Sequence, residues 1–256
     1  MSSKPTNRIA KDIYLKEYSN DFVDRWDELI NWKGRKEAEN GFFQRILREN
    51  GAKSVLDIGC GTGFHTCDFA RDGFDVTGAD GAATMVEKAR ENAERLGLHQ
   101  VEFHVAEWTS LTSVFPDEKF DAIVCLGNAL THLFEEKDRI KTLTEVYSLL
   151  NDGGVAIIDH RNYDRILDEG YSSKHKFYYT GDEVEVYPDE VSEQTFKMRY
   201  QYSDGSFYHL TMCPIRKDYV SGLLKQVGFK DIQTFGDFKP KFDISEPDFI
   251  VQVAKK

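Results

Sequence analysis

The sequence predicts an α/β protein built on a doubly wound, mostly parallel sheet. Short apolar runs rich in Val, Ile and Phe alternate along the chain with longer segments whose apolar residues recur at helical spacing. A glycine-rich turn follows the first run, and polar residues gather where the runs end. Strands that alternate with helices pair in parallel, and ligands bind outside the carboxyl ends of such strands. We therefore expect the functional residues at those ends.

Five strands and three helices are expected before residue 165. The strands cover residues 53–59, 74–80, 101–108, 120–128 and 154–160. The helices cover residues 63–73, 82–97 and 136–154, because apolar residues recur there at helical spacing and each segment ends in glycine.

After residue 164 the pattern changes to that of antiparallel strands. Residues 174–216 contain alternating aromatic and polar residues, with turns expected at the sequences GDE, PDE and SDGS. A helix at 218–229 and strands at 230–238 and 247–256 are expected to return to the main sheet.

Two parts of the chain lie outside this sheet in the prediction. Residues 1–45, which include VDRWDELINW, are expected to form a helical cap segment over the sheet edge or the mouth of the site. Residues 46–256 form the main domain, which carries an inserted antiparallel β subdomain at about 165–216.

The composition favours a cytoplasmic enzyme that acts on a small molecule. The formal net charge is −11, whereas binding to nucleic acid or to anionic lipid requires clustered Lys and Arg. No run of 18 apolar residues occurs, and the first residues do not resemble a signal sequence. The four cysteines are widely spaced and form no CxxC pair, which is typical of reduced cytosolic thiols. The seven histidines are scattered, so no metal is expected.

The sequence VLDIGCGTGF, a strand followed by a glycine turn and a helix, is the first chemical motif. Gly59, Gly61 and Gly63 allow the backbone to approach a ligand closely and direct free amides towards it. The alternative is a turn that only packs the helix on the strand. A dinucleotide site would require glycine at position 64, which is Phe64. The GxGxG spacing after Asp57 instead resembles the first motif of class I S-adenosylmethionine-dependent methyltransferases, which have a Rossmann-like doubly wound sheet.

Two further strand ends agree with a ligand of this kind. Asp80, at the end of the second strand, is suited to accept hydrogen bonds from two ribose hydroxyls. Glu107 and Trp108, at the end of the third, could contact adenine through its amino group and its ring face.

The second constellation is CLGNALTHL (125–133) together with IDHRNYD (158–164). With the glycine turn, the YY pair at 178–179 and GDFKP at 236–240, these stretches resemble the glycine N-methyltransferases. The resemblance extends from DRWDELINW to the last strand. It is greatest to the microbial glycine/sarcosine N-methyltransferases, which carry out the early methylations of glycine towards betaine, a compatible solute.

The resemblance implies a set of site residues. The S-adenosylmethionine site would be formed by Tyr18, Trp26, Arg35, Gly59, Gly61, Gly63, Asp80, Glu107, Trp108 and Leu126. Asn128, Arg161 and Tyr200 would hold the amino acid, and His132, Tyr163 and Tyr178 would be neighbours of the reacting centre. Met212 and Cys213 stand where the animal enzymes have a tyrosine pair, so one aromatic wall differs.

Arg161 also has a chemical reason to be there. Glycine offers only a carboxylate and an amine, so its recognition depends on a guanidinium fork and a few amide and hydroxyl groups. The alternative for Arg161 is a salt bridge with Asp159 or Asp164, and for His132 a structural role at a helix end.

Three functions are therefore open at this stage. The first is methylation of glycine and sarcosine, the second is methylation of sarcosine and dimethylglycine, and the third is a sensor that binds S-adenosylmethionine or folate without turnover. The expected partner is a small amino acid, and both a monomer and a homo-oligomer are open.

Overall fold

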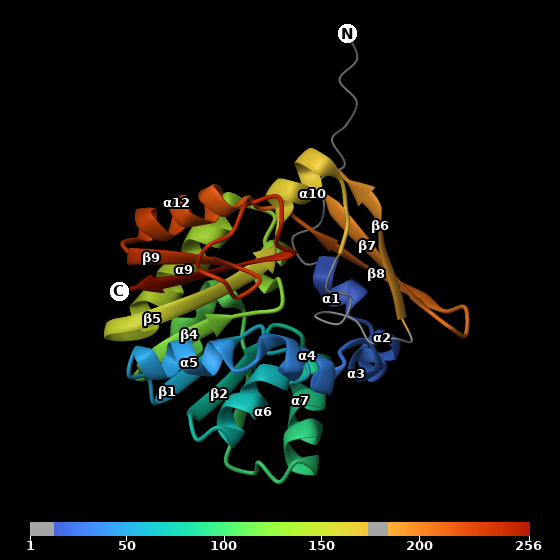
Figure 1. Cartoon of the computed structure of the whole chain (residues 1–256). Helices are drawn as coiled ribbons and strands as arrows, with labels where there is room; N and C mark the ends of the chain where they lie inside the picture. Colours follow the sequence, from blue (N-terminus) through green and yellow to red (C-terminus); the bar gives the residue numbers. More distant parts are fainter. Residues whose placement is uncertain (1–12, 174–183) are drawn as a thin grey trace.

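A seven-stranded sheet forms the centre of the computed structural model, which describes residues 13–173 and 184–256 (Figure 1). The strand order is β3-β2-β1-β4-β5-β10-β9. β1 to β5 are parallel, whereas β10 runs antiparallel between β5 and β9. The bounds are β1 Ser54–Ile58, β2 Asp75–Asp80, β3 Glu102–Val105, β4 Phe120–Cys125, β5 Leu150–Arg161, β9 Lys230–Gly236 and β10 Phe249–Lys255. The predicted doubly wound α/β fold is confirmed.

Helices cover both faces of this sheet because its strands are apolar on both sides. In β1, Val55 packs with residues of α5 and α6, while its neighbour Leu56 packs with residues of α9 and α12 on the opposite face. Among the described residues, the helices after the first forty are α5 Phe42–Glu49, α6 Phe64–Arg71, α7 Ala83–Arg95, α8 Leu111–Val114, α9 Glu136–Leu149, α10 Tyr163–Glu169 and α12 Lys217–Val227. Short 3₁₀ helices occupy Trp108–Ser110 (η1) and Ala129–His132 (η2).

The strand order reverses beside β1. β1 continues through α6 to β2 on one side, while β4 lies on its other side. Loops leaving the carboxyl ends of β1 and β4 therefore diverge and leave a crevice, which is where open α/β sheets bind ligands.

Four short helices of the N-terminal segment lie across that crevice. They are α1 Ile13–Glu17, α2 Asn20–Asp24, α3 Trp26–Leu29 and α4 Trp32–Glu39. In Figure 1 the dark-blue helices α1, α2 and α3 lie between the main sheet and a second, smaller sheet. The Glu17 carboxylate of α1 accepts hydrogen bonds from the amide and hydroxyl of Thr211, at 2.7 and 2.6 Å. These contacts join α1 to the second sheet.

The second sheet has three antiparallel strands in the order β6-β7-β8. They span Val184–Val191, Phe196–Tyr202 and Phe207–Met212. Alternate residues of β7 are buried, which leaves one face towards the cavity and one towards solvent. The expected turn at SDGS is present, with Gly205 in the left-handed conformation and the Tyr202 amide bonded to the Ser206 carbonyl.

Two details of the sequence prediction are wrong. The PDE sequence at 188–190 is not a turn: it lies within β6, and the chain turns at Ser192–Thr195 instead. Pro188 is tolerated because β6 is an edge strand. The helix expected to reach residue 154 ends at Leu149, and residues 150–154 already belong to β5. The GDE turn lies outside the described residues.

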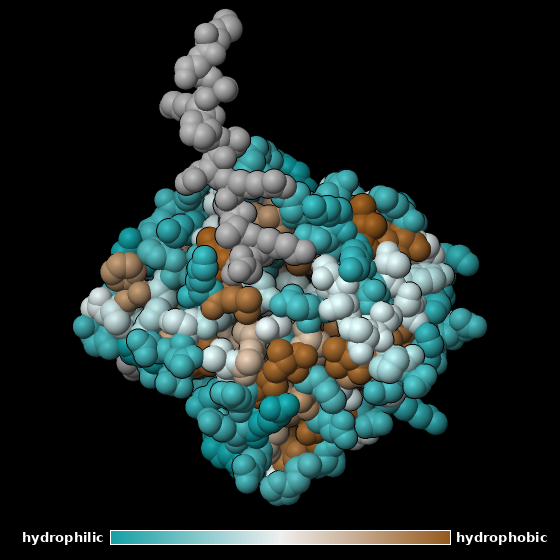
Figure 2. All heavy atoms as spheres, turned by 180° about the vertical axis from the view of Figure 1, so that it is seen from behind, coloured by the Kyte–Doolittle hydropathy of each residue, from teal (hydrophilic) through white to brown (hydrophobic). Residues whose placement is uncertain are grey.

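The face of the molecule opposite to the view of Figure 1 is mainly polar. Seen from behind, teal hydrophilic spheres dominate the outline, and brown hydrophobic spheres gather in patches nearer the middle of that face (Figure 2). Among the described helices, none is long and apolar enough to cross a lipid bilayer.

Candidate active site

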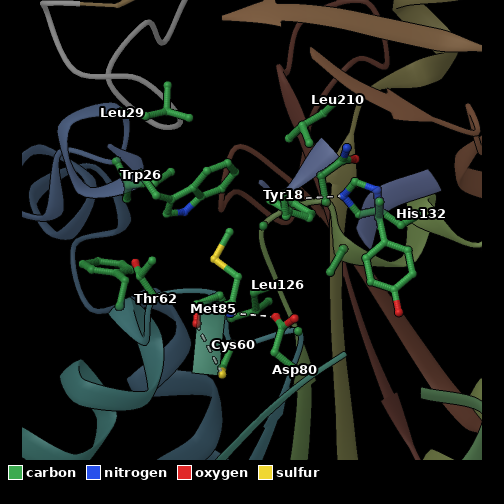
Figure 3. Close-up of a pocket in the computed structure, with 18 of the residues that line it drawn as sticks. Tyr18, Trp26, Leu29, Cys60, Thr62, Asp80, Met85, Leu126, His132 and Leu210 are labelled. Carbon is green, nitrogen blue, oxygen red and sulfur yellow. Dashed lines mark hydrogen bonds between the residues drawn. The ribbon is translucent and has the colours of Figure 1, made fainter. Parts of the chain in front are cut away.

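A cavity of about 970 Å³, part of it open to solvent, lies over the carboxyl ends of β1, β2 and β4. Figure 3 shows side chains from three sources converging on it, namely the N-terminal helices, the loops of the main sheet and the second sheet. Examples are Trp26, Asp80 and Leu210.

The glycine turn forms the floor of the cavity. Its first residues are held to β2, because the amides of Gly59 and Cys60 both donate to the Ala79 carbonyl, at 2.7 and 3.0 Å. Gly59 has φ +77°, and a Cβ there would lie 3.0 Å from the Ala129 Cβ and 3.2 Å from the Trp108 ring. Only glycine fits this turn, since a side chain would be strained and would collide with two loops.

Asp80, the last residue of β2, presents a half-buried carboxylate to the cavity. One oxygen accepts from the Gly61 amide at 3.0 Å and the other from the Ala82 amide at 2.9 Å. Burial raises the pKa of this carboxyl to about 6, and the two amide hydrogen bonds oppose that rise. Asp80 is thus fixed by backbone amides and is mainly ionised above pH 6.

The end of β3 is covered by Tyr14 from α1. Its phenol donates to the Glu107 carboxylate at 2.8 Å, and its ring lies nearly parallel to that of Trp108, with centroids 6.2 Å apart. Trp108 lines the cavity, whereas Glu107 lies beside it. The N-terminal helices therefore reach directly over two of the residues expected to contact adenine.

Arg35 enters the cavity wall from α4 as part of a buried ion-pair group. Its Nε lies 3.0 Å from the Glu39 carboxylate, which also contacts His65 Nε2 at 2.8 Å. Burial pushes the pKa of Glu39 upwards, but the contacts with His65 and Arg35 outweigh it and lower the pKa. Glu39 is therefore an anion that orients Arg35 towards the cavity.

Tyr18 and His132 form a second pair in the cavity wall. The Tyr18 hydroxyl lies 3.1 Å from His132 Nε2, the contact drawn as a dashed line in Figure 3. Burial lowers the pKa of His132 to about 4, so the imidazole is neutral at physiological pH. Burial also keeps the pKa of Tyr18 well above its usual value, so the phenol stays protonated.

Asn128 is held in place by several side chains at once. It has φ +67°, and its amide donates to the buried Asp159 carboxylate at 2.8 Å. Its side-chain oxygen accepts from the Arg161 amide at 3.0 Å, and Nδ2 lies 3.0 Å from both the Tyr163 hydroxyl and the Met212 sulfur. The ends of β4 and β5 are thus joined through Asn128.

Arg161, the last residue of β5, is only 5% exposed and lines the same cavity. Tyr200 of β7 approaches it from the second sheet. Burial raises the pKa of Tyr200 to about 12 against the opposing effect of the Arg161 charge and hydrogen bond. Asp164 faces away, since it accepts from the Lys217 amide at 2.9 Å and lies 3.8 Å from Arg216. A guanidinium and a phenol thus share a desolvated corner of the pocket.

Comparisons with known proteins agree with this geometry. Residues 55–154 match a family described as a methyltransferase domain. The chain is 50% identical to the glycine/sarcosine N-methyltransferase of Aphanothece halophytica over 96% of this chain and 92% of that protein. The chain belongs to the glycine/sarcosine N-methyltransferase family.

Two more matches extend this result. The glycine/sarcosine N-methyltransferase of Halorhodospira halochloris is 47% identical over 98% of this chain and 93% of that protein. The crystal structure of an S-adenosylmethionine-dependent methyltransferase from Clostridium acetobutylicum shares the fold, with a TM-score of 0.71 at 20% identity over 92% of this chain and 98% of that one.

The cavity contains most of the residues expected from the family resemblance. It is lined by Tyr18, Trp26, Arg35, Gly59, Gly61, Asp80, Trp108, Leu126, Asn128, His132, Arg161 and Tyr200. Gly63, Glu107 and Tyr163 lie beside it rather than in its wall, and each contacts a neighbouring element. Tyr178 lies outside the described residues.

Several lining residues had not been singled out as site residues from the sequence. They include Tyr14, Cys60, Thr62, Met85 and Met212. Cys60 and Thr62 could have been found, because they stand between the three glycines. Met212 was noted only as a departure from the animal enzymes. Tyr14 and Met85 belong to helices and carry no motif of their own.

Proposed function

We propose that the protein transfers methyl groups from S-adenosylmethionine to the amine of glycine and then of sarcosine, giving sarcosine and dimethylglycine. The observation that carries this proposal is the desolvated pairing of Arg161 with Tyr200 in the same cavity as the glycine turn and Asp80. The names of the relatives support it. Successive methylation of glycine leads to betaine, and these are its first two steps.

The residues around the glycine turn fit the methyl donor. We assign the ribose hydroxyls to Asp80, whose carboxylate is already oriented by two amides. Arg35, held by Glu39, is suited to the donor's carboxylate, and Trp108 and Leu126 offer apolar surface for adenine. When bound, the donor supplies an electrophilic methyl group on a sulfonium. The helical segment within residues 1–45 acts as the cap over this site.

The substrate carboxylate is assigned to Arg161, with the Tyr200 hydroxyl as a second donor. Asn128 Nδ2 faces the Met212 sulfur, which is a weak acceptor, so a carboxylate oxygen would replace it with a stronger hydrogen bond. Because the corner is desolvated, a charged fork and two polar groups suffice to hold so small a molecule. His132, Tyr163 and Tyr178 are proposed as neighbours of the reacting centre.

The chain's own residues contribute mainly by positioning. Methyl transfer to a neutral amine is an in-line displacement that needs no protein nucleophile, and correct alignment can contribute about 7 to 11 kcal/mol. The amine must first lose a proton to solvent, so the reaction is expected to accelerate towards alkaline pH. His132 stays neutral and places no competing cation beside the sulfonium.

Four cysteines without disulfide partners, three of them buried, support action in a reducing, cytoplasmic compartment. The expected partners are therefore a soluble methyl donor and a free amino acid.

A turnover assay with labelled S-adenosylmethionine tests this function. Glycine and sarcosine should both accept methyl groups, at rates that rise between pH 7 and pH 9, and dimethylglycine should be a poor substrate. If dimethylglycine were the best of the three, the protein would instead act on sarcosine and dimethylglycine. If the donor bound but no amine were methylated, a non-catalytic sensor would replace the enzyme.

A further inference from the structure

Asp27 of α3 is joined to three separate elements through one carboxylate. One oxygen accepts from the Thr62 hydroxyl at 2.8 Å and from Trp32 Nε1 at 3.2 Å. The other accepts from Asn92 Nδ2 at 2.9 Å. These donors belong to the glycine turn, to the start of α4 and to α7, so a single half-buried side chain holds the N-terminal helices against the main domain.

Two of the residues that donate to Asp27, Thr62 and Asn92, are themselves held in place by burial and by further hydrogen bonds. Asn92 Nδ2 also donates to the Thr62 carbonyl at 3.0 Å, and the Asn92 side-chain oxygen accepts from Arg95 at 2.9 Å. Thr62 and Asn92 are 2% and 3% exposed. Because both are fixed within the main domain, Asp27 is the partner whose position the network determines.

The same short stretch of α3 also contacts the turn through its preceding residue. A Cβ on Gly61 would lie 4.0 Å from Trp26 Nε1, so the indole stands directly over the glycine turn. In Figure 3, Trp26 and Thr62 lie on the same side of the pocket. Residues 26–27 therefore contact residues 61–62. These two contacts set the distance between α3 and the glycine turn.

We propose that Asp27 is a positioning residue for the methyl donor, a role that rests on the proposed function. It touches neither reacting atom. Through Thr62 and Trp26 it sets the distance between α3 and the glycine turn, where the amino-acid end of the donor would bind. Through Trp32 it orients α4, the helix that carries Arg35. Loss of Asp27 should weaken donor binding while the substrate corner around Arg161 is preserved.

Donor affinity is the decisive measurement. In Asp27→Ala, the dissociation constants of S-adenosylmethionine and S-adenosylhomocysteine, measured by calorimetry, should each rise roughly tenfold or more, because a charged hydrogen-bond acceptor is lost from three donors. The KM for glycine and kcat at saturating donor should stay within about threefold of wild type. The matched control is Asp24→Asn, at an exposed acid three residues earlier, which should bind the donor as wild type does.

A double-mutant cycle separates positioning from a general effect on folding. Thr62→Val keeps the shape of the side chain but removes the hydroxyl that Asp27 accepts. It should also weaken donor binding, and the double variant should bind the donor no more weakly than Asp27→Ala alone, because Asp27→Ala already removes the contact between Asp27 and Thr62. Additive losses, or donor affinities within twofold of wild type in either single variant, would overturn the proposal. Thr62→Val tests the proposal by itself even if Asp27→Ala does not fold.

The outcome for the overall function can be read separately. A wild-type protein that binds the donor but methylates neither glycine nor sarcosine would refute the proposed reaction, while the effect of Asp27 on donor affinity would still be measured in the same titrations.

Discussion

Asp80 combines a functional requirement with a cost of burial. In the proposed role, the Asp80 carboxylate must be ionised to accept hydrogen bonds from two ribose hydroxyls, whereas its burial raises its pKa to about 6. The two amides that contact it offset part of this cost and also orient it. If Asp80 binds the donor's ribose as proposed, its ionisation sets the pH range in which the donor binds.

We expect donor affinity to depend on pH through Asp80. The ionised form binds, so the dissociation constant for S-adenosylhomocysteine should be nearly constant above pH 7 and should rise about tenfold per pH unit below pH 6. The free energy of unfolding has the opposite pH dependence. Because the pKa of Asp80 is raised in the folded protein, protonation of Asp80 stabilises the fold at low pH, and this stabilisation is lost as pH rises through about 6. Calorimetry from pH 5 to 8 measures the first effect, and Asp80→Asn should abolish the dependence. A flat profile in wild type would contradict the assignment.

Arg161 is the second residue whose chemistry can be isolated. Arg161→Ala removes the cation from a desolvated carboxylate, which costs about 2 to 5 kcal/mol, so kcat/KM for glycine should fall by roughly thirty-fold to several thousand-fold. Arg161→Lys keeps the charge but loses the fork and should be intermediate. Affinity for the donor should change far less in both. An alanine variant that folds and uses glycine within a few-fold of wild type would show that Arg161 is only structural.

At the scale of elements, the three glycines of the turn have different tasks. Gly59 and Gly61 line the cavity, while Gly63 allows α6 to begin against α7. Gly63 has φ +88°, and a Cβ there would lie 3.2 Å from the Ala89 Cβ. A motif that looks uniform in sequence is therefore divided between ligand binding and helix packing, as in other glycine turns of this architecture.

Two alanine substitutions can separate backbone strain from packing. Gly63→Ala should lower the free energy of unfolding by more than Gly73→Ala, which has φ +89° but no atom within 4 Å of its added Cβ. The control should cost about 1 to 2 kcal/mol from strain alone, and the collision with α7 should add to that in Gly63→Ala. Urea denaturation gives both values. Equal losses would mean that α7 shifts freely and that Gly63 is not a packing residue.

The whole molecule shows which parts of the fold and site could be predicted from sequence. Local sequence signals mark the strands, which are apolar runs. They also mark the glycine turn, Asp80 and the IDHRNYD stretch, which lie at the ends of such runs. The contacts of the N-terminal helices carry none. α1 and α3 have five and four residues, too few for a periodic pattern, and Tyr14 and Asp27 meet partners 93 and 35 residues away. Such pairings depend on the tertiary fold.

The antiparallel strand β10 has a consequence for how the protein is made. It pairs with the whole second half of β5, with Phe249 opposite Arg161, and the Phe249 ring lies 5.8 Å from the guanidinium. During synthesis β5 leaves the ribosome long before β10. The edge of β5 that will pair with β10 therefore stays unpaired while the second sheet and α12 are translated. Arg161 acquires its last neighbour only then. The corner assigned to the amino acid is therefore among the last parts of the molecule to form, and a ribosome that stops before residue 249 would release a chain with an open strand edge beside an unfinished arginine site.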